Sequence, residues 1–323
     1  MQVLAGLTGP YPRPETLVSA TRDLDRGRTS AEAVESLYRS TEDAVLALER
    51  RLGFESVTAG FLRWPDLFRP FAETWEGVAV GPLTRWLETN TFFRQPILLA
   101  PPHRVPGALA ARLPPPLRPD PRSARVLLPG PYTFAGVSEN RSGDADEAVV
   151  HRLGRMLSEE VRELRAAGFG SFLFSEPLLV VRPPEGPRAE AVVAGYRAIQ
   201  TALNGGTSIV WTYGADAAPA LPLLDRLPVS VVGIDLADTD IDRLPEGPQR
   251  AGLGLGVIDS RTTLGEDPGE VARVVRAAYE RRRPPGVTLG PGGPLDLLPW
   301  EPATRKISVL PAVVKTLGEG GRP

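Results

Sequence analysis

The sequence predicts an α/β protein, a (β/α)8 TIM barrel formed as a single domain. Two observations lead to this prediction. Short apolar runs alternate with helical patterns along the chain, and eight such runs are each followed by helical material. Repeated strand–helix units favour a parallel sheet, and eight of them favour closure into a barrel. The 323 residues suffice for one large barrel, so one domain is expected over residues 1–323.

Continuous apolar runs bounded by turn residues are typical of strands buried on both faces. The predicted strands are residues 2–7, 55–59, 125–128, 171–174, 208–211, 229–234, 252–258 and 287–289. The seventh run contains G-L-G-L-G, which lies too late in the chain for a dinucleotide-binding turn. Its glycines are expected to give backbone room in a tightly packed barrel.

Helical periodicity and capping residues mark the segments between the strands. Thr29 and Glu32, and likewise Asp144 and Glu147, have capping-box spacing, and Asp267 followed by Pro268 is a helix start. The predicted helices are residues 30–52, 67–75, 145–167, 187–203, 217–224, 302–317 and one that begins at Asp267.

Two segments interrupt the alternation. Residues 91–99 fit one arm of a hairpin, and residues 101–122 are dominated by proline and arginine. A stretch of this composition can be an interdomain linker or a loop that crosses a surface. The units on both sides look alike, so a surface loop near residues 101–122 is predicted.

Composition excludes several classes of function. The chain has no cysteine, which excludes disulfides, thiolate metal sites and thiol nucleophiles, and its two histidines, His103 and His151, have no evident catalytic partner. The formal charge of −2, with both signs interspersed, does not favour nucleic acid as a partner. No run reaches membrane-spanning length and residues 1–10 do not resemble a signal peptide, so a cytoplasmic protein with no membrane partner is expected. The oligomeric state is left open.

Polar residues cluster directly after the predicted strands, at the barrel end where substrates bind. Glu176, Asp235 and Asp259 could together bind a divalent metal, or two of them could act as an acid/base pair. Alternatively, each accepts backbone N–H bonds or pairs with an arginine. The polar residues at this end are Arg13, Arg63, Asp66, Tyr132, Glu176, Thr212, Tyr213, Asp216, Asp235, Asp238, Asp259 and Arg261.

Short motifs occur in a fixed order along almost the whole chain. They lie at residues 9–12, 63–66 with 71–73, 130–133, 175–177, 213–214, 234–235 and 256–259. In order and spacing they resemble the catalytic, C-terminal barrel of cobalamin-independent methionine synthases. The chain is most similar to the short, single-domain type of archaea and some bacteria, as a divergent member.

The resemblance implies methyl transfer from a folate or corrinoid donor to the thiol of homocysteine, activated by zinc. The family's zinc ligands, one His, two Cys and one Glu, fall on Val210, Thr212, Gly293 and Asp235 of this chain. Only Asp235 keeps a suitable donor, so neither zinc nor another cofactor is expected.

Further positions depart from the family's pattern. Its first-loop Ser is Pro10, its Glu after the second strand is Phe61, its Asp before Glu-Pro is Ser175, and its aromatic platform is Val137. The expected ligand is a small molecule, namely an amino acid or a folate or corrinoid methyl donor. The candidate catalytic residues are Asp235 and Asp259, and the candidate substrate-binding residues are Arg13, Arg63, Asp66, Glu176 and Tyr213.

Three hypotheses follow. The first is a methionine-synthase-like methyltransferase whose zinc and homocysteine sites are largely not preserved. The second is a non-catalytic barrel that binds a ligand or partner. The third is a hydrolase that uses Glu176 with Asp235 or Asp259.

Overall fold

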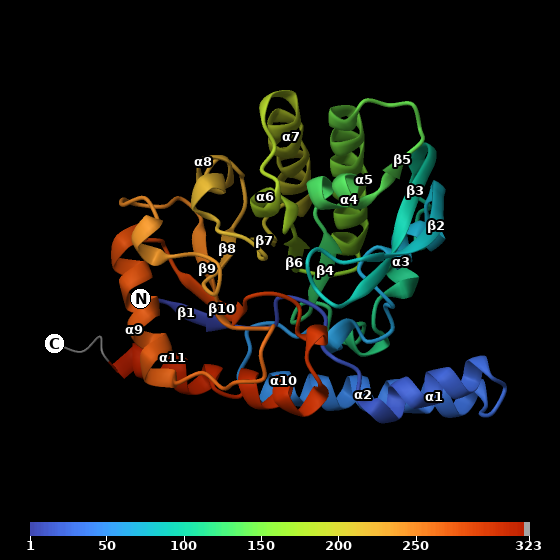
Figure 1. Cartoon of the computed structure of the whole chain (residues 1–323), viewed down its shortest axis with the longest axis horizontal. Coiled ribbons are helices and arrows are strands. Elements are labelled where there is room, and N and C mark those ends of the chain that lie inside the picture. The colour runs from blue at the N-terminus through green and yellow to red at the C-terminus, as the bar shows by residue number, and fades with distance from the viewer. Residues whose placement is uncertain (320–323) are drawn as a thin grey trace.

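The computed structural model describes residues 1–319, and its centre is a curled, seven-stranded parallel sheet (Figure 1). The strand order is β1-β10-β9-β8-β7-β6-β4, and every neighbouring pair is parallel. The strands are β1 (Val3–Ala5), β4 (Arg125–Pro129), β6 (Ser171–Ser175), β7 (Thr207–Trp211), β8 (Val231–Asp235), β9 (Gly252–Ile258) and β10 (Val287–Pro291).

Residues 55–57 fill the gap between β1 and β4. The N–H of Glu55 donates to the carbonyl of Ala5 at 3.1 Å, and the N–H of Val57 donates to Ser123 at 2.9 Å. The N–H of Arg125 donates back to Val57 at 2.8 Å. With these bonds, residues 55–57 take the second strand position, and eight strand positions close a ring in chain order. The predicted (β/α)8 barrel is therefore confirmed. The second predicted strand is shorter than expected, because the backbone turns at residues 59–61.

Helices cover the outside of the barrel. In Figure 1, α1, α2, α10 and α11 lie along one side and α5 and α7 on the opposite side. No helix within residues 1–319 is both long and apolar enough to span a bilayer. The helices are α1 (Glu15–Asp25), α2 (Ala31–Arg51), α3 (Arg69–Thr74), α4 (Pro131–Val137), α5 (Asp146–Ala166), α6 (Leu178–Val181), α7 (Gly186–Leu203), α8 (Leu221–Leu224), α9 (Pro268–Arg282), α10 (Trp300–Ile307) and α11 (Leu310–Glu319).

Some predicted helix details were wrong. The N-cap of α2 is Ser30, whose hydroxyl accepts from the N–H of Ala33, in place of Thr29. The carboxylate of Asp144 does not cap α5, because it accepts hydrogen bonds from Arg152. The single helix predicted over residues 302–317 is broken between α10 and α11. The Asp267 cap is confirmed, since its carboxylate accepts from the N–H of Glu270.

A hairpin lies in the chain between the second barrel strand, residues 55–57, and β4. It consists of β2 (Glu76–Arg85) and β3 (Phe92–His103), which pair antiparallel, and β3 also pairs with β5 (Glu139–Asn140). The hairpin arm predicted over residues 91–99 is therefore confirmed and extends to His103. The chain from there to β4 contains two 3-10 turns, Ala110–Arg112 and Pro115–Leu117.

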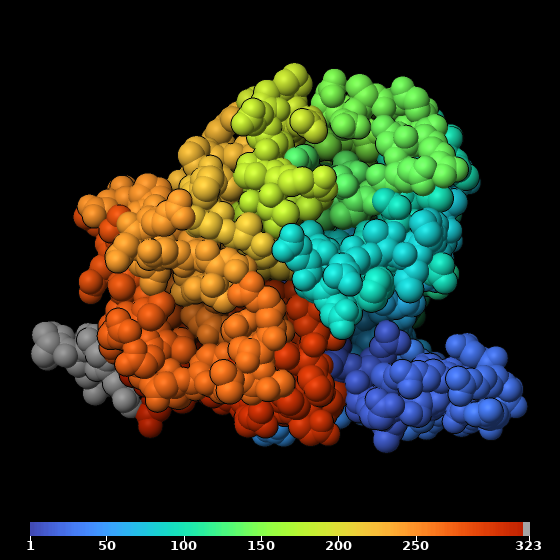
Figure 2. All heavy atoms as spheres, viewed as in Figure 1, coloured from blue at the N-terminus to red at the C-terminus, as the bar shows by residue number. Residues whose placement is uncertain are grey.

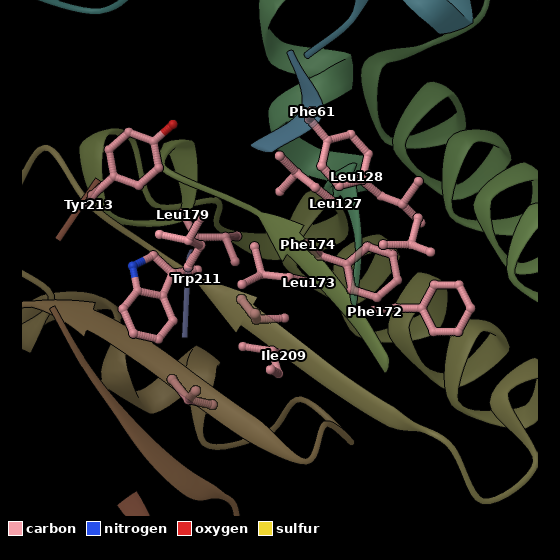
Figure 3. Close-up of a cluster of buried hydrophobic side chains, with 14 of the residues drawn as sticks. Phe61, Leu127, Leu128, Phe172, Leu173, Phe174, Leu179, Ile209, Trp211 and Tyr213 are labelled. Carbon is pink, nitrogen blue, oxygen red and sulfur yellow. The ribbon is translucent and has the colours of Figure 1, made fainter. Parts of the chain in front are cut away.

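The barrel interior is filled by one large side chain opposite glycines. The indole of Trp211 is fully buried, and its Nε1 donates to the carbonyl of Gly292 at 2.8 Å. A Cβ at Gly233 would lie 2.2 Å from the indole, and one at Gly254 would lie 2.6 Å from it. The glycines of the seventh strand therefore give backbone room, as predicted. Figure 3 shows Trp211 and Tyr213 beside β7, with Phe172 on the side of the helices.

Candidate functional site

A narrow cavity opens at the carboxyl ends of the barrel strands, where α/β barrels bind their ligands. Its walls come from the loops that follow β1, residues 55–57, β6, β7 and β10, and the hairpin adds Trp86 and Phe93. Phe68 and Tyr213 also line it, so most of its surface is aromatic or aliphatic. In Figure 2 the hairpin, in cyan, reaches from one side of the molecule to the yellow-green and red segments.

Two carboxylates line this cavity, Asp66 and Asp296, and they differ in their hydrogen bonds to other residues. Asp66 Oδ1 accepts from the N–H groups of Phe68 and Arg69 at 2.9 and 2.8 Å, and its Oδ2 accepts from Arg94 at 3.1 Å. Asp66 thus ties the loop before α3 to β3. Asp296 has no hydrogen bond to another residue within residues 1–319.

The charges around Asp296 suit a polar ligand. Its side chain is reached by solvent, yet the surrounding protein desolvates the carboxylate and raises its pKa to about 6, against the opposing effect of Arg13. Arg13 is half-buried and close enough to act on this carboxylate. Nearby, the Tyr213 hydroxyl lies 3.3 Å from Ser175 Oγ, and burial raises the pKa of Tyr213. Of the predicted substrate-binding set, Asp66 and Tyr213 line the cavity, and Arg13 lies near Asp296 without lining it.

Arg63 lies outside the cavity lining. Its guanidinium donates four hydrogen bonds, at 2.6–3.1 Å, to the carboxylates of Glu35 and Glu42 on α2. Because its donors are used within the protein, this position argues for a structural role instead of the predicted contact with substrate.

Glu176 is fully buried on the helix side of β6. Its carboxylate accepts from the N–H groups of Tyr132 and Thr133 at 3.0 and 2.7 Å and from the Tyr196 hydroxyl at 3.2 Å. These bonds satisfy the first amides of α4, the role of a helix-capping acceptor. Burial raises the pKa of Glu176 to about 7. A Cβ at Gly130 would lie 2.0 Å from this carboxylate, which leaves room there only for glycine.

The two predicted catalytic carboxylates do not form a pair with shared contacts. Asp235, at the end of β8, is 4% exposed, and its Oδ1 accepts from the N–H of Ala237 at 2.9 Å. Burial raises the pKa of Asp235 to about 7. Asp259 Oδ1 instead accepts from the N–H and Nε of Arg261, at 2.9 and 3.3 Å. Both carboxylates therefore hold loops.

The positions to which the family resemblance assigns zinc ligands do not fit a metal. Side chains alternate along a strand. Since Trp211 faces the barrel interior, Val210 and Thr212 point toward the helices, and the Thr212 hydroxyl donates to the carbonyl of Gly233 at 2.8 Å. Gly293 has no side chain to offer, which leaves the Asp235 carboxylate alone. Within residues 1–319 no three His, Cys, Asp or Glu side chains are grouped to hold a metal ion.

The remaining polar residues of the sequence prediction form ion pairs and hydrogen bonds within the protein at this end of the barrel. Asp238 accepts from Arg261 at 2.8 Å, and Asp216 pairs with Arg243 at 2.5 Å. The Tyr132 hydroxyl donates to a backbone carbonyl. Both histidines are exposed and lie outside the cavity.

Sequence reasoning missed Asp296 and the hairpin residues of the cavity. Asp296 follows the last strand by a few residues, so the rule that found the other candidates applied to it as well. Trp86 and Phe93 carry no such signal, because they reach the mouth only through the folding of the hairpin over it.

Comparison with known proteins gives the family. Residues 78–282 match the family model described as "Cobalamin-independent synthase, N-terminal domain". The chain belongs to the cobalamin-independent methionine synthase family. The matching model describes the family's N-terminal domain, whereas the motif resemblance was to its catalytic, C-terminal barrel. The two comparisons agree on the family and differ in the barrel to which they compare the chain.

Relatives within the family cover the chain to different extents. A methionine synthase of Sulfurisphaera tokodaii is 25% identical over 308 residues, which are 93% of this chain and 88% of the relative. A 5-methyltetrahydropteroyltriglutamate–homocysteine methyltransferase of Mycobacterium tuberculosis H37Rv is 32% identical over 213 residues, 62% of this chain but 27% of the longer relative.

Solved structures of the family share the fold. A B12-independent methionine synthase from Shewanella sp. W3-18-1, in complex with selenomethionine, has a TM-score of 0.73 at 17% identity and covers 98% of both chains. An enzyme described as a vitamin-B12-independent methionine synthase of Listeria monocytogenes has a TM-score of 0.68 at 14% identity and covers 100% of both.

Proposed function

We propose that this synthase-family barrel binds a small amino-acid-like ligand in its mouth and does not by itself methylate homocysteine through a bound zinc ion. The observation that carries the proposal is which side chains occupy the four zinc-ligand positions and where they point. Val210 and Thr212 face the helices, and Asp235 is the sole donor left at the four positions. Zinc sites in proteins use three or four His, Cys or carboxylate ligands, so one carboxylate does not suffice.

The ligand class follows from the charges and walls of the cavity. Asp296 supplies a carboxylate that accepts no hydrogen bond from another residue within residues 1–319, and Arg13 lies close enough to lower its pKa. A cation and an anion beside aromatic walls complement a zwitterion with an apolar side chain. The Shewanella relative, crystallised with selenomethionine, supports this class.

A second candidate keeps the family's methyl transfer with a folate or corrinoid donor. Tyr213 and Asp66 favour it, because both belong to the predicted substrate-binding set and both line the cavity. This candidate requires a way to activate the thiol of homocysteine other than through the four mapped positions.

Two measurements on the purified chain test the proposal. Calorimetric titration with L-methionine and L-homocysteine is expected to show one site per chain, weakened at least tenfold by Asp296→Asn. Glu246→Gln, an exposed carboxylate far along the sequence on the loop before β9, is the matched control and should leave affinity unchanged. Methyl transfer from methylated folate or methylcobalamin to homocysteine is expected to be absent with or without zinc. Zinc-dependent turnover, or no binding of either amino acid, would overturn the proposal.

A further inference from the structure

Three consecutive residues that follow the second barrel strand have left-handed backbone conformations. Their φ angles are 52° at Ala59, 74° at Gly60 and 53° at Phe61, and all three residues are buried. Glycine adopts such angles readily, whereas alanine and phenylalanine rarely do. Strain of this kind persists only where the surroundings enforce it, and it is often found at functional sites.

A buried carboxylate on α2 enforces this turn. Glu49 is fully buried, and its Oε1 accepts from the N–H of Thr58 at 2.9 Å and from the Thr58 hydroxyl at 2.8 Å. Its Oε2 accepts from the N–H of Ala59 at 3.0 Å, while Thr58 Oγ1 accepts from the N–H of Gly60 at 3.1 Å. Every donor at the start of the turn is therefore bound to Glu49 or to a hydroxyl that Glu49 orients.

The turn is connected to two walls of the cavity. The carbonyl of Gly60 accepts from the N–H of Tyr11 at 3.0 Å, which fixes the loop after β1. In the other direction, the Phe61 ring packs 4.7 Å from Trp64, just before the wall formed by residues 65–68. At the end of that wall, the Phe68 ring lies 5.5 Å from Trp86 in the hairpin.

We propose that Glu49 is a positioning residue of the cavity: it holds the strained turn at residues 59–61 and thereby sets the two loops that form the cavity walls. The role of the cavity as a ligand site rests on the proposed function, whereas the positioning of its walls does not.

The experiment compares Glu49→Gln with Glu42→Gln. Glu42 is a fully buried carboxylate on the same helix, and it pairs with Arg63 instead of the turn. In Glu49→Gln an amide N–H₂ meets backbone N–H donors, so we expect the amides of Thr58 and Ala59 to exchange with solvent roughly tenfold faster or more. The indole N–H resonance of Trp86 should also shift, and affinity for L-methionine should fall. Glu42→Gln should leave these three readouts unchanged.

A double variant tests whether Glu49 acts through the strain. Ala59→Gly removes the Cβ that makes its φ unfavourable, so Glu49→Gln with Ala59→Gly should regain the wild-type Trp86 signal. If Glu49→Gln leaves the Trp86 signal and the exchange rates unchanged, or if Glu42→Gln alters them equally, the positioning role is overturned. If wild-type protein does not bind L-methionine, the proposed function fails, while the two ligand-free readouts still decide the role of Glu49.

Discussion

The two halves of the barrel mouth differ in whether their polar groups are free. Around β1, residues 55–57 and β10, the loops leave a cavity in which Asp296 has no hydrogen bond to another described residue. Below and beside this cavity, Trp211 of β7 fills the barrel interior, and the Asp235 carboxylate at the end of β8 is covered by Gly292. A polar residue at a strand end thus marks the functional face, but its use depends on whether the backbone already occupies its atoms.

The packed side of the barrel, where Trp211 lies against glycines, is called the closed half. Replacing one of these glycines should have the largest effect on stability. In Gly233→Ala the new Cβ would lie 2.2 Å from Trp211 in a fully buried layer. We expect a loss of about 3 kcal/mol or more in the free energy of unfolding, measured by urea denaturation. Adding Trp211→Leu should reduce the penalty of Gly233→Ala, because the clashing ring is gone. Additive losses in the double variant would show that the two residues do not share one packed layer.

Breaking the Arg63 cluster should have the next largest effect. Arg63→Ala leaves the fully buried Glu42 carboxylate without its cation, and we expect a loss of about 2–3 kcal/mol in unfolding free energy. Affinity for L-methionine should be unchanged, because Arg63 does not line the cavity. A selective loss of binding with full stability would instead assign Arg63 to the ligand.

Stability should rise as the pH falls from 8 to 6. Burial raises the folded-state pKa of Glu49, Glu176 and Asp235 to about 7, well above their values in an unfolded chain. Protonation therefore favours the folded state, and the gain is lost as pH rises through 7. Each group should contribute about 1 kcal/mol between pH 8 and pH 6. Glu176→Gln should reduce the slope measured by denaturation at each pH, and an unchanged slope would contradict the assignment.

The smallest effect is expected at the solvent-exposed edge of the closed half. Arg261 donates to Asp238 and Asp259, but its side chain is 42% exposed. Arg261→Ala should cost about 0.5 kcal/mol or less, because solvent screens exposed ion pairs. A loss as large as that of Arg63→Ala would show that this edge is part of the core.

Local patterns were sufficient to predict most of the fold. Seven barrel strands and the hairpin arm follow from apolar runs and turn residues. The end of the second barrel strand, residues 55–57, could not be predicted. The left-handed turn after Val57 depends on Glu49, a residue of another element. The spacing of Glu49 with Val45 on α2 and with Leu52, the residue that follows this helix, indicates a buried face, which is a signal that this glutamate does not face solvent.

The cavity lies at the end of the barrel where the sequence predicts a ligand site, but the contacts of the individual residues did not follow from the sequence. Asp66 and Tyr213 line one cavity because strand ends converge, and this convergence follows from topology alone. The sequence could not show that Glu176 serves α4 or that Asp235 holds a loop, because such contacts depend on tertiary distances. The packing of Trp211 against Gly233 and Gly254 likewise requires the register between β7, β8 and β9.

Equilibrium zinc binding tests the central claim most directly. The purified chain would be incubated with excess zinc, passed over a desalting column and assayed for metal content, with competition by a chelator of known affinity. We expect no stoichiometric zinc, because Val210 and Thr212 face the helices and Asp235 alone remains. One tightly held zinc ion per chain, lost in Asp235→Asn, would contradict the closed half of the mouth and restore the family's zinc chemistry.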